Sequence, residues 1–584
     1  MFRGLTLLVD LILLHPPTIY NFREKTVVLG PISDVVPSSP ILESYPIGFL
    51  SILSFLTKHG YKIKILNVAL KMLLNKNFNL QKTLKSLKPL AFGIDLHWLP
   101  HVEGSLKLAK LIKSIHPDKP IIFGGMSATY YHLELINYPY VDYVLRGDTV
   151  EEPLLKLIEC LEKKQQPENI PNLTWKINGK IKVNPLSFVP ENLDDYMVDY
   201  GLVIKAAAKD LDPTAYLPYK DWFKYPMAAV LPLKGCPYNC ITCGGSNFTY
   251  KNICNRTKTA LKKPETLAEE IKIISEYIKG AIFILNDLRI CGEKYVEKLF
   301  TNLKNEKIDN PLVFELFKPA NKKFLENLLK ISPNASVEIS PESHDEEIRK
   351  SFGRMYGNFE LEKTLNFICQ LGFERVDVFF MIGLPQQNQA SIVDTIRYME
   401  KLFNLFKNKK TVYHPFIAPL APFLDPGSLV FENPKVYGYK LFYKTLQEHF
   451  EALEMLSWKY FLNYETKWMS RDEIVKTTYM AANLINKVKL KHGLIDKDEA
   501  EVIFEKLKIA EETTLKIDEI LKNFKGEDLE INLKKLKDEV EKAYEGLLCS
   551  KKELLTWPSR KGLDVRLKIL GALTKNYLKT FFRF

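Results

Sequence analysis

The stretch of sequence that decides the fold is Gly235-Cys236-Pro237-Tyr238-Asn239-Cys240-Ile241-Thr242-Cys243-Gly244-Gly245-Ser246. It follows an apolar run, residues 227–233, which we predict to be a buried strand. Three of the eight cysteines lie in this stretch with the spacing C-x3-C-x2-C. A turn-rich loop of this kind can direct three thiolates at one inorganic group, and three ligands leave one iron of a four-iron cluster open. We therefore predict a 4Fe–4S cluster on Cys236, Cys240 and Cys243.

A structural zinc site is the alternative for the same cysteines. Zinc would need a fourth nitrogen or sulfur ligand. Cys254 is the nearest candidate, and no histidine lies between Cys243 and His344. The spacing from Cys243 to Cys254 matches no common zinc module. The sequence therefore favours the cluster over zinc.

Length and composition describe an ordinary globular chain of several domains. The 584 residues exceed what one core holds, and 46% of them are hydrophobic and 26% charged. The apolar run at residues 5–14 is interrupted by Asp10 and is too short to span a bilayer. Eight cysteines in so long a chain indicate a reducing compartment, so we expect a cytoplasmic protein. The net charge is +12, but the basic residues are spread along the chain and alternate with acidic ones. We therefore expect no nucleic-acid partner.

Short apolar runs alternate with helical patterns through the first 165 residues. The predicted strands are residues 10–14, 61–66, 90–94, 121–123 and 140–145, and the predicted helices are 47–59, 78–87, 102–115 and 151–163. This alternation predicts an α/β fold with a doubly wound parallel sheet, whose ligands lie at the carboxyl ends of the strands. At one such end, Gly124 and Gly125 would let the backbone approach a ligand, and Ser127 and Thr129 would supply hydroxyls.

The segment 166–226 is predicted to be a connector, because prolines interrupt any regular pattern there. It carries a cluster of aromatic side chains: Tyr216, Tyr219, Trp222, Phe223 and Tyr225. We interpret this cluster as a cover for hydrophobic surface and not as a ligand site.

From residue 227 the alternation of strands and helices resumes and continues to about residue 430. Six strands are predicted, at residues 227–233, 281–285, 312–317, 336–339, 376–382 and 412–417. Sites in such βα arrangements gather at the carboxyl ends of the strands. The residues expected there are Asn286, Asp287, Lys318, Ser340 to Ser343, and Gly383-Leu384-Pro385.

Residues 431–584 are predicted to form a helical domain in which strands no longer occur. Ser470 and Glu473 have the spacing of a capping box, and three further helices are expected after Asp496. The last segment, residues 566–584, is basic and amphipathic. We expect it to dock on the barrel, and contact with a membrane surface is the alternative.

The cysteine loop and its preceding strand resemble the radical S-adenosylmethionine (radical SAM) superfamily, although Thr242 stands where that family usually has an aromatic residue. Ile339-Ser340-Pro341-Glu342-Ser343 resembles the segment that meets the methionyl and ribose parts of SAM. Gly383-Leu384-Pro385 resembles the segment beside the adenine. The segments "PDKPIIFGGMSATYY" and "VDYVLRGDTVEEPLLKLI" are similar to the cobalamin-binding domain that many such enzymes carry at their N-terminus.

This resemblance implies three domains: a cobalamin-binding, Rossmann-like domain at 1–165, a partial (β/α)6 barrel at 227–430, and the helical domain at 431–584. It implies a 4Fe–4S cluster, SAM and cobalamin as cofactors, with Asp287, Glu342, Ser343 and Gly383 near SAM and Gly124, Gly125, Ser127 and Thr129 near cobalamin. It also implies an electron donor of the flavodoxin or ferredoxin type. The expected enzyme generates a 5′-deoxyadenosyl radical and methylates an unactivated carbon. The alternatives are another radical reaction (coupling, ring formation or sulfur insertion) without cobalamin, and a non-catalytic metal-binding scaffold.

Asp95-Leu96-His97 invites comparison with the DxHxxG motif, whose histidine ligates cobalt. Here Pro100 occupies the glycine position, and the segment follows the third predicted strand instead of the first. We therefore expect that no histidine of this segment ligates cobalt.

Overall fold

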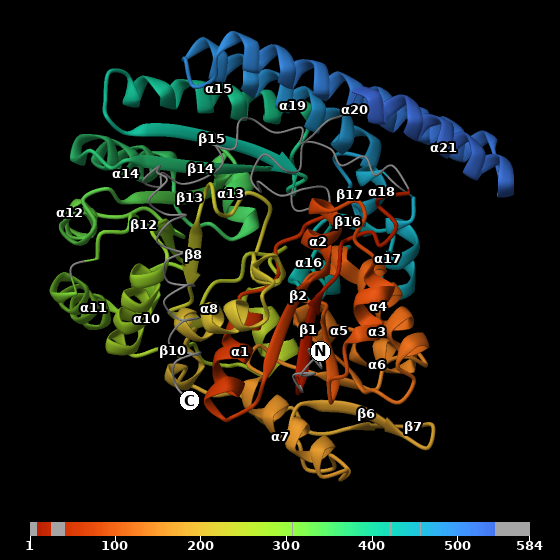
Figure 1. Ribbon diagram of the computed structural model, residues 1–584. Coiled ribbons are helices and arrows are strands. Elements are labelled where there is room, and N and C mark those ends of the chain that lie inside the picture. The colour runs from red at the N-terminus through yellow and green to blue at the C-terminus, as the bar shows by residue number, and fades with distance from the viewer. Residues whose placement is uncertain (1–8, 25–40, 307, 420–422, 456, 544–584) are drawn as a thin grey trace.

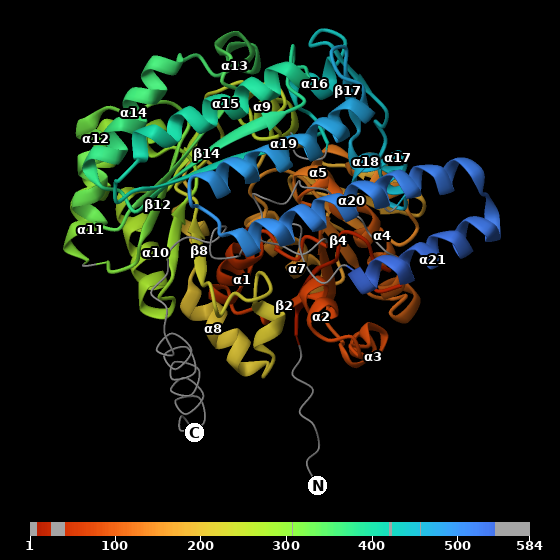
Figure 2. The same cartoon turned by 90° about the horizontal axis from the view of Figure 1, so that it is seen from above.

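Two parallel sheets and a set of long C-terminal helices make up the molecule. The computed structural model describes residues 9–24, 41–306, 308–419, 423–455 and 457–543. Figure 1 shows the N-terminal sheet beside the second sheet, with the C-terminal helices running along one side of both. In the view from above, α19 and α20 lie across the second sheet and extend over the N-terminal sheet (Figure 2).

The N-terminal sheet has seven strands in the order β2-β1-β3-β4-β5-β6-β7. The first five are parallel and confirm the predicted doubly wound sheet. They are β1 (Leu11–His15), β2 (Ile63–Asn67), β3 (Ala91–Asp95), β4 (Ile121–Gly124) and β5 (Tyr143–Leu145). The helices between them are α1 (Gly48–Lys58), α2 (Val68–Leu74), α3 (Leu80–Ser86), η2 (Leu99–His101), α4 (Val102–Ile115), α5 (Met126–Tyr130), α6 (His132–Asn137) and α7 (Glu151–Glu162).

The central strands of this sheet are buried along their whole length. Every residue of β1 and of β3 is buried, as expected for parallel strands covered by helices on both faces. Their two polar residues stand at their carboxyl ends, His15 on β1 and Asp95 on β3. The polar side chains of the sheet therefore meet at the edge where a ligand would bind.

The predicted connector contains regular structure that the proline pattern did not indicate. Strands β6 (Leu173–Ile177) and β7 (Lys180–Val183) form an antiparallel hairpin that adds two strands to the N-terminal sheet. The hairpin turns at Asn178 and Gly179, both in the left-handed region. Asn-Gly with this backbone conformation is common in two-residue hairpin turns. Then come η3 (Asp194–Tyr196), α8 (Tyr200–Lys209) and η4 (Pro213–Tyr216). The prediction of an irregular connector was therefore wrong for these residues.

The second sheet is the predicted six-stranded parallel array, in the order β15-β14-β13-β12-β11-β8. Its strands are β8 (Met227–Val230), β11 (Ala281–Ile284), β12 (Leu312–Leu316), β13 (Ser336–Glu342), β14 (Arg375–Ile382) and β15 (Val412–Pro419). The intervening elements are β9 (Leu233–Lys234), α9 (Asn247–Cys254), β10 (Ala260–Leu261), α10 (Pro264–Tyr277), η5 (Leu288–Cys291), α11 (Glu293–Asn305), α12 (Lys322–Ile331), α13 (Glu346–Phe352), α14 (Asn358–Leu371) and α15 (Gln389–Phe406). All six strands follow one another as neighbours, so their carboxyl ends form one rim.

The C-terminal part is not purely helical. Strands β16 (Tyr439–Leu441) and β17 (Tyr464–Thr466) pair antiparallel, which corrects the expectation that strands stop before this region. The helices are α16 (Leu429–Glu432), α17 (Leu446–Leu453), α18 (Trp458–Phe461), α19 (Arg471–Lys491), α20 (Lys497–Asn523) and α21 (Gly526–Ala543). Ser470 and Glu473 form the predicted capping box of α19. Residues 566–584 lie outside the described part of the chain. Among the described residues, no helix combines the length and the apolar character needed to cross a bilayer.

Candidate active site

The cysteine loop lies at the rim of the six-stranded sheet and is fastened there by main-chain hydrogen bonds. It opens at Gly235, whose φ is +94° and where a Cβ would lie 3.0 Å from Cδ of Arg256. Farther on, Ile241 N donates to Phe352 O after β13, and Ile241 O accepts from Val430 N after β15. The loop is therefore held from two sides by segments that are distant in sequence.

The three cysteines differ in exposure: Cys240 is buried, Cys236 is half-buried and Cys243 is exposed. Burial raises the pKa of Cys236 and of Cys240, although Arg354 acts on Cys240 in the opposite direction. Although Cys243 is exposed as a residue, the protein atoms around its sulfur raise the pKa of the thiol, and the carboxylate of Asp425 adds to this. Thiolates in such a place need a positive partner, which bound iron would supply.

The spacing of the sulfurs argues against a single zinc ion. A tetrahedral ion with metal–sulfur bonds of about 2.3 Å would bring its thiolates to within about 4 Å of one another. Within the described part of the chain, only His15, Asp95 and His97 bring three donor atoms within 4.8 Å of one another. Cys254, the candidate fourth zinc ligand, instead has its sulfur 3.6 Å from Sδ of Met126. The loop thus suits a group wider than one ion.

Glu342 is a strained and incompletely satisfied residue at the end of β13. A register shift separates it from Ile339 in the pairing with β14, and its φ is +66°, a left-handed value that a non-glycine residue adopts only at a cost. Its side chain is 1% exposed. Oε1 accepts a 3.0 Å bond from Arg354, whereas Oε2 has no partner among the described residues. Burial raises the pKa of Glu342 to about 7, with Arg354 opposing the shift.

Arg354 connects this carboxylate to the cysteine loop. Its guanidinium lies over the Phe317 ring, 5.4 Å from the centroid, and donates to Phe317 O. Gly353, beside it, has φ +116°, and a Cβ there would come within 3.0 Å of Asn239 O in the loop. The orphaned Glu342 Oε2 and the cysteine loop therefore border the same region of the rim. A ligand with a hydroxyl or ammonium donor could satisfy the free oxygen.

The other residues predicted to lie near SAM are occupied by protein contacts. The Asp287 carboxylate accepts from Arg289 and from Phe317 N. The Ser343 hydroxyl accepts from Asp345 N, and Gly383 binds Gln387 through its N–H and Tyr439 through its carbonyl. These bonds shape the rim. Contact of Asp287, Ser343 and Gly383 with a cofactor remains a prediction.

Three histidines, His15, His97 and His101, meet Asp95 at the carboxyl edge of the N-terminal sheet. Asp95 binds Nδ1 of His15 at 3.0 Å and Nδ1 of His97 at 2.6 Å. Burial alone would raise the pKa of Asp95, but His15 and His97 outweigh it and lower that pKa. Nε2 of His15 bonds Leu42 O. Both nitrogens of His15 therefore face acceptors, and its ring and Asp95 form a buried hydrogen-bonded pair.

The two adjacent glycines at this edge have different roles. A Cβ at Gly124 would meet nothing closer than 4.0 Å, so the space above it is open to a ligand. At Gly125, with φ +115°, a Cβ would lie 2.5 Å from Cα of His97. Gly125 is thus required by the packing of its own domain. The Thr129 hydroxyl is also engaged, since it donates to Gly125 O and accepts from Gly147 N; the hydroxyl of Ser127 bonds to none of the described residues.

Side chains of both domains connect the rim of the six-stranded sheet to the carboxyl edge of the N-terminal sheet. Trp98, after β3, packs edge-on against Phe423, two positions before Asp425. Asp425 in turn accepts a 2.9 Å bond from Gly244 N of the cysteine loop. Arg256 makes a buried ion pair with Asp148 after β5. The cysteine loop and the N-terminal edge are thereby fixed against each other.

Comparison with known families agrees with this geometry. Residues 37–154 match the B12 binding domain family, and residues 230–399 match the Radical SAM superfamily. The chain combines a B12-binding domain with a radical SAM domain. The first match covers the edge with Gly124 and Asp95, and the second covers the cysteine loop and Glu342.

One curated protein and two solved structures illustrate what the chain is similar to. An uncharacterized methyltransferase of Pyrococcus horikoshii is 23% identical over 300 residues, which is 50% of this chain and 61% of that relative. The structure of OxsB, a cobalamin-dependent SAM radical enzyme with aqua-cobalamin and SAM bound, superposes with a TM-score of 0.55 and 12% identity, covering 98% of this chain and 84% of that one. The methyltransferase TsrM of Kitasatospora setae, with cobalamin and a [4Fe-4S] cluster bound, superposes with a TM-score of 0.52 and 13% identity. That superposition covers 74% of this chain and 81% of the TsrM chain. At these identities the structural matches establish the shared fold.

Sequence reasoning missed three residues that the radical SAM domain brings to its rim. Arg354 binds Glu342, and Asp425 binds the cysteine loop. Tyr464 of β17 is fully buried, and its hydroxyl has no partner among the described residues. Only Arg354 had a local signal, since it directly follows the helix-ending Gly353. Tyr464 comes from the C-terminal part, which carried no motif, whereas Asp425 lies near the end of the predicted barrel segment.

Proposed function

We propose that this protein is a cobalamin-dependent radical SAM enzyme that methylates an unactivated carbon. One observation carries the proposal: the three-cysteine loop and the open edge at Gly124 belong to different domains and are held together through the segment of Phe423 and Asp425, which contacts Trp98 and Gly244. When bound, the cluster with SAM would supply a 5′-deoxyadenosyl radical, and the cobalamin would supply a methyl group. A substrate between the domains could meet both.

The protein's own residues would bind, orient and shield. Cys236, Cys240 and Cys243 would hold the cluster and leave one iron for SAM. Glu342 Oε2 would accept a hydrogen bond from the ribose or amino group of SAM, because it is buried and has no partner among the described residues. The hydrophobic packing around the rim would exclude water from the reacting groups.

The N-terminal edge would hold cobalamin over Gly124, with Ser127 offering a hydroxyl that bonds none of the described residues. Asp95 occupies Nδ1 of His97, so Nε2 is the atom through which His97 could reach cobalt. We keep the expectation that it does not. His97→Ala should then leave the visible spectrum of bound cobalamin essentially unchanged, and a clear shift of the cobalt bands would identify His97 as a ligand.

The decisive experiment is anaerobic reconstitution of the whole chain with iron, sulfide, cobalamin and a strong one-electron reductant. A flavodoxin or ferredoxin is the donor class we propose in the cell. We expect about four irons and one cobalt per chain, and formation of 5′-deoxyadenosine. Replacing all three loop cysteines by alanine should abolish the iron–sulfur absorbance. Stoichiometric zinc without iron would refute the cluster, and 5′-deoxyadenosine formation in a protein that binds no cobalamin would point to another radical reaction.

A further inference from the structure

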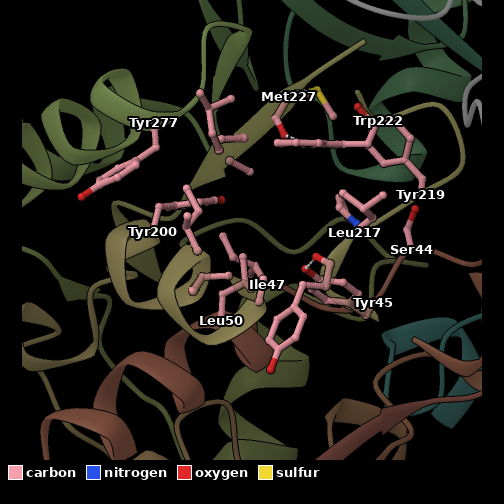
Figure 3. A pocket seen from close by; sticks show the side chains of 18 of the residues that line it. Ser44, Tyr45, Ile47, Leu50, Tyr200, Leu217, Tyr219, Trp222, Met227 and Tyr277 are labelled. Carbon is pink, nitrogen blue, oxygen red and sulfur yellow. Dashed lines mark hydrogen bonds between the residues drawn. The ribbon is translucent and has the colours of Figure 1, made fainter. Parts of the chain in front are cut away.

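A large apolar cavity lies between the B12-binding domain and the radical SAM domain. Its volume is about 370 Å³, within the range of small-molecule sites. Its walls come from the loop before α1, from α8, from the aromatic part of the connector and from β8. Figure 3 shows these side chains turned toward one open space, with the rings of Tyr45, Tyr219 and Trp222 along one side.

The polar atoms of these rings are already bound within the protein. Tyr45 donates its hydroxyl to Tyr216 O, and Tyr219 donates to Tyr225 O. The indole N–H of Trp222 donates to Met227 O at 2.9 Å. The rings therefore offer a ligand mostly carbon surface. A nucleotide or a sugar would lose hydrogen bonds to water here without replacement, whereas a hydrocarbon would not.

The cavity is lined by segments that continue along the chain into both halves of the candidate active site. One wall is β8, which ends at Val230, six positions before Cys236. The opposite wall includes Ser44 and Tyr45, which follow directly on Leu42 and Glu43. The carbonyls of Leu42 and Glu43 bind His15 and Asn67 at the carboxyl edge of the N-terminal sheet. A molecule in the cavity would thus lie along the boundary at which both cofactors are expected.

We propose that this cavity holds the apolar part of the substrate, an alkyl, terpenoid-like or aromatic group without charge. This inference rests on the proposed function for its meaning, since a carbon that receives a methyl group must lie between the two domains. It also revises the interpretation of the connector aromatics as a mere surface cover. An empty apolar cavity costs stability in proportion to its volume, and a bound hydrophobic group would recover that cost.

The test fills the cavity from a wall that is remote from both cofactor sites. Ala207 of α8 lines the cavity and is 7% exposed, whereas Ala208 on the same helix does not line it. N-phenyl-1-naphthylamine, a neutral apolar dye, is titrated into the full-length protein. We expect saturable fluorescence with about one site per chain. Ala207→Phe should weaken dye binding at least tenfold, and Ala208→Phe should leave it within twofold.

A substitute variant and a competition measurement complete the experiment. Ala207→Leu replaces Ala207→Phe if the larger variant fails to keep the wild-type melting temperature and iron content. Decanol should displace the dye, and adenosine should not. No saturable binding, equal binding by the Ala207 and Ala208 variants, or displacement by adenosine would each overturn the proposal. Failure of the proposed function is a separate observation, because it would appear as missing 5′-deoxyadenosine in a protein that still binds the dye.

Discussion

At the scale of single residues, Glu342 is the clearest sign of a ligand. Its strained backbone and orphaned oxygen cost stability in the free protein. Glu342→Gln should weaken SAM binding by about 10- to 100-fold, since a charge-assisted hydrogen bond contributes about 1.5–3 kcal/mol, while the iron content stays constant. Equilibrium binding of SAM to the reconstituted protein measures this. Glu347→Gln, on the exposed side of α13, is the control, and equal affinities for both variants would make Glu342 structural.

The same residue predicts a pH dependence with a definite sign. Burial raises the pKa of Glu342 to about 7, so the carboxyl is protonated below that pH and ionised above it. The cationic SAM should therefore bind more tightly as pH rises from 6 to 8, and Glu342→Gln should flatten this rise. In the free protein the same ionisation lowers stability as pH rises from about 4.5 toward 7, because the folded state holds the proton more strongly than the unfolded state. A pH-independent affinity would contradict the prediction.

Gly124 and Gly125 form a matched pair for separating ligand binding from folding. Gly124→Leu should block cobalamin binding with little effect on the melting temperature, because the space above this residue is open. Gly125→Ala should lower stability by at least about 2 kcal/mol, since φ is +115° and the new Cβ would lie 2.5 Å from the His97 backbone. Thermal melting and cobalt content give both readouts. Equal melting temperatures for the two variants would contradict this division.

At the scale of elements, Tyr464 of β17 packs against Gly383, the residue that follows β14. Gly383 has φ +97°, and a Cβ there would come within 2.3 Å of the Tyr464 hydroxyl oxygen. Gly383→Ala should therefore be strongly destabilising. Tyr464→Phe alone should be neutral or stabilise by up to about 1 kcal/mol, because the buried hydroxyl has no partner among the described residues. The double variant should be more stable than Gly383→Ala alone in thermal melts, by more than the effect of Tyr464→Phe on the wild type. If the effects of the two substitutions on stability simply add, the Cβ at position 383 and the Tyr464 hydroxyl do not meet.

At the scale of the whole molecule, a few buried polar contacts fix the two domains against each other. Arg256 is 2% exposed and binds Asp148 of the B12-binding domain as well as Pro190 O of the connector. Lys234 adds a bond to Asp148 O. The loop after β5, which lies at the ligand edge by topology, is therefore used for docking between domains.

Asp148→Asn should disturb this interface, because it leaves a buried guanidinium without its anion. Breaking such a pair costs about 3–5 kcal/mol, so the melting temperature should fall and proteases should gain access to the connector. Glu191→Gln is the matched control, since it removes an ion pair with Lys258 whose side chains are 68% and 72% exposed and that contributes at most about 1 kcal/mol. An Asp148→Asn protein as stable and as protease-resistant as the control would show that the domains are held otherwise.

The sequence by itself determined the features that depend on local pattern. Alternating apolar runs predicted both parallel sheets, because each strand and helix shows its own periodicity. The spacing of Cys236, Cys240 and Cys243 in one loop predicts the cluster site without any distant residue. The tertiary structure alone decided what depends on contacts between distant segments. It brought Arg354 to Glu342, Asp425 to Gly244 and Tyr464 to Gly383, and it gathered the connector aromatics around a cavity. None of these pairings has a sequence period, since each arises from the way the two domains and the C-terminal strands pack.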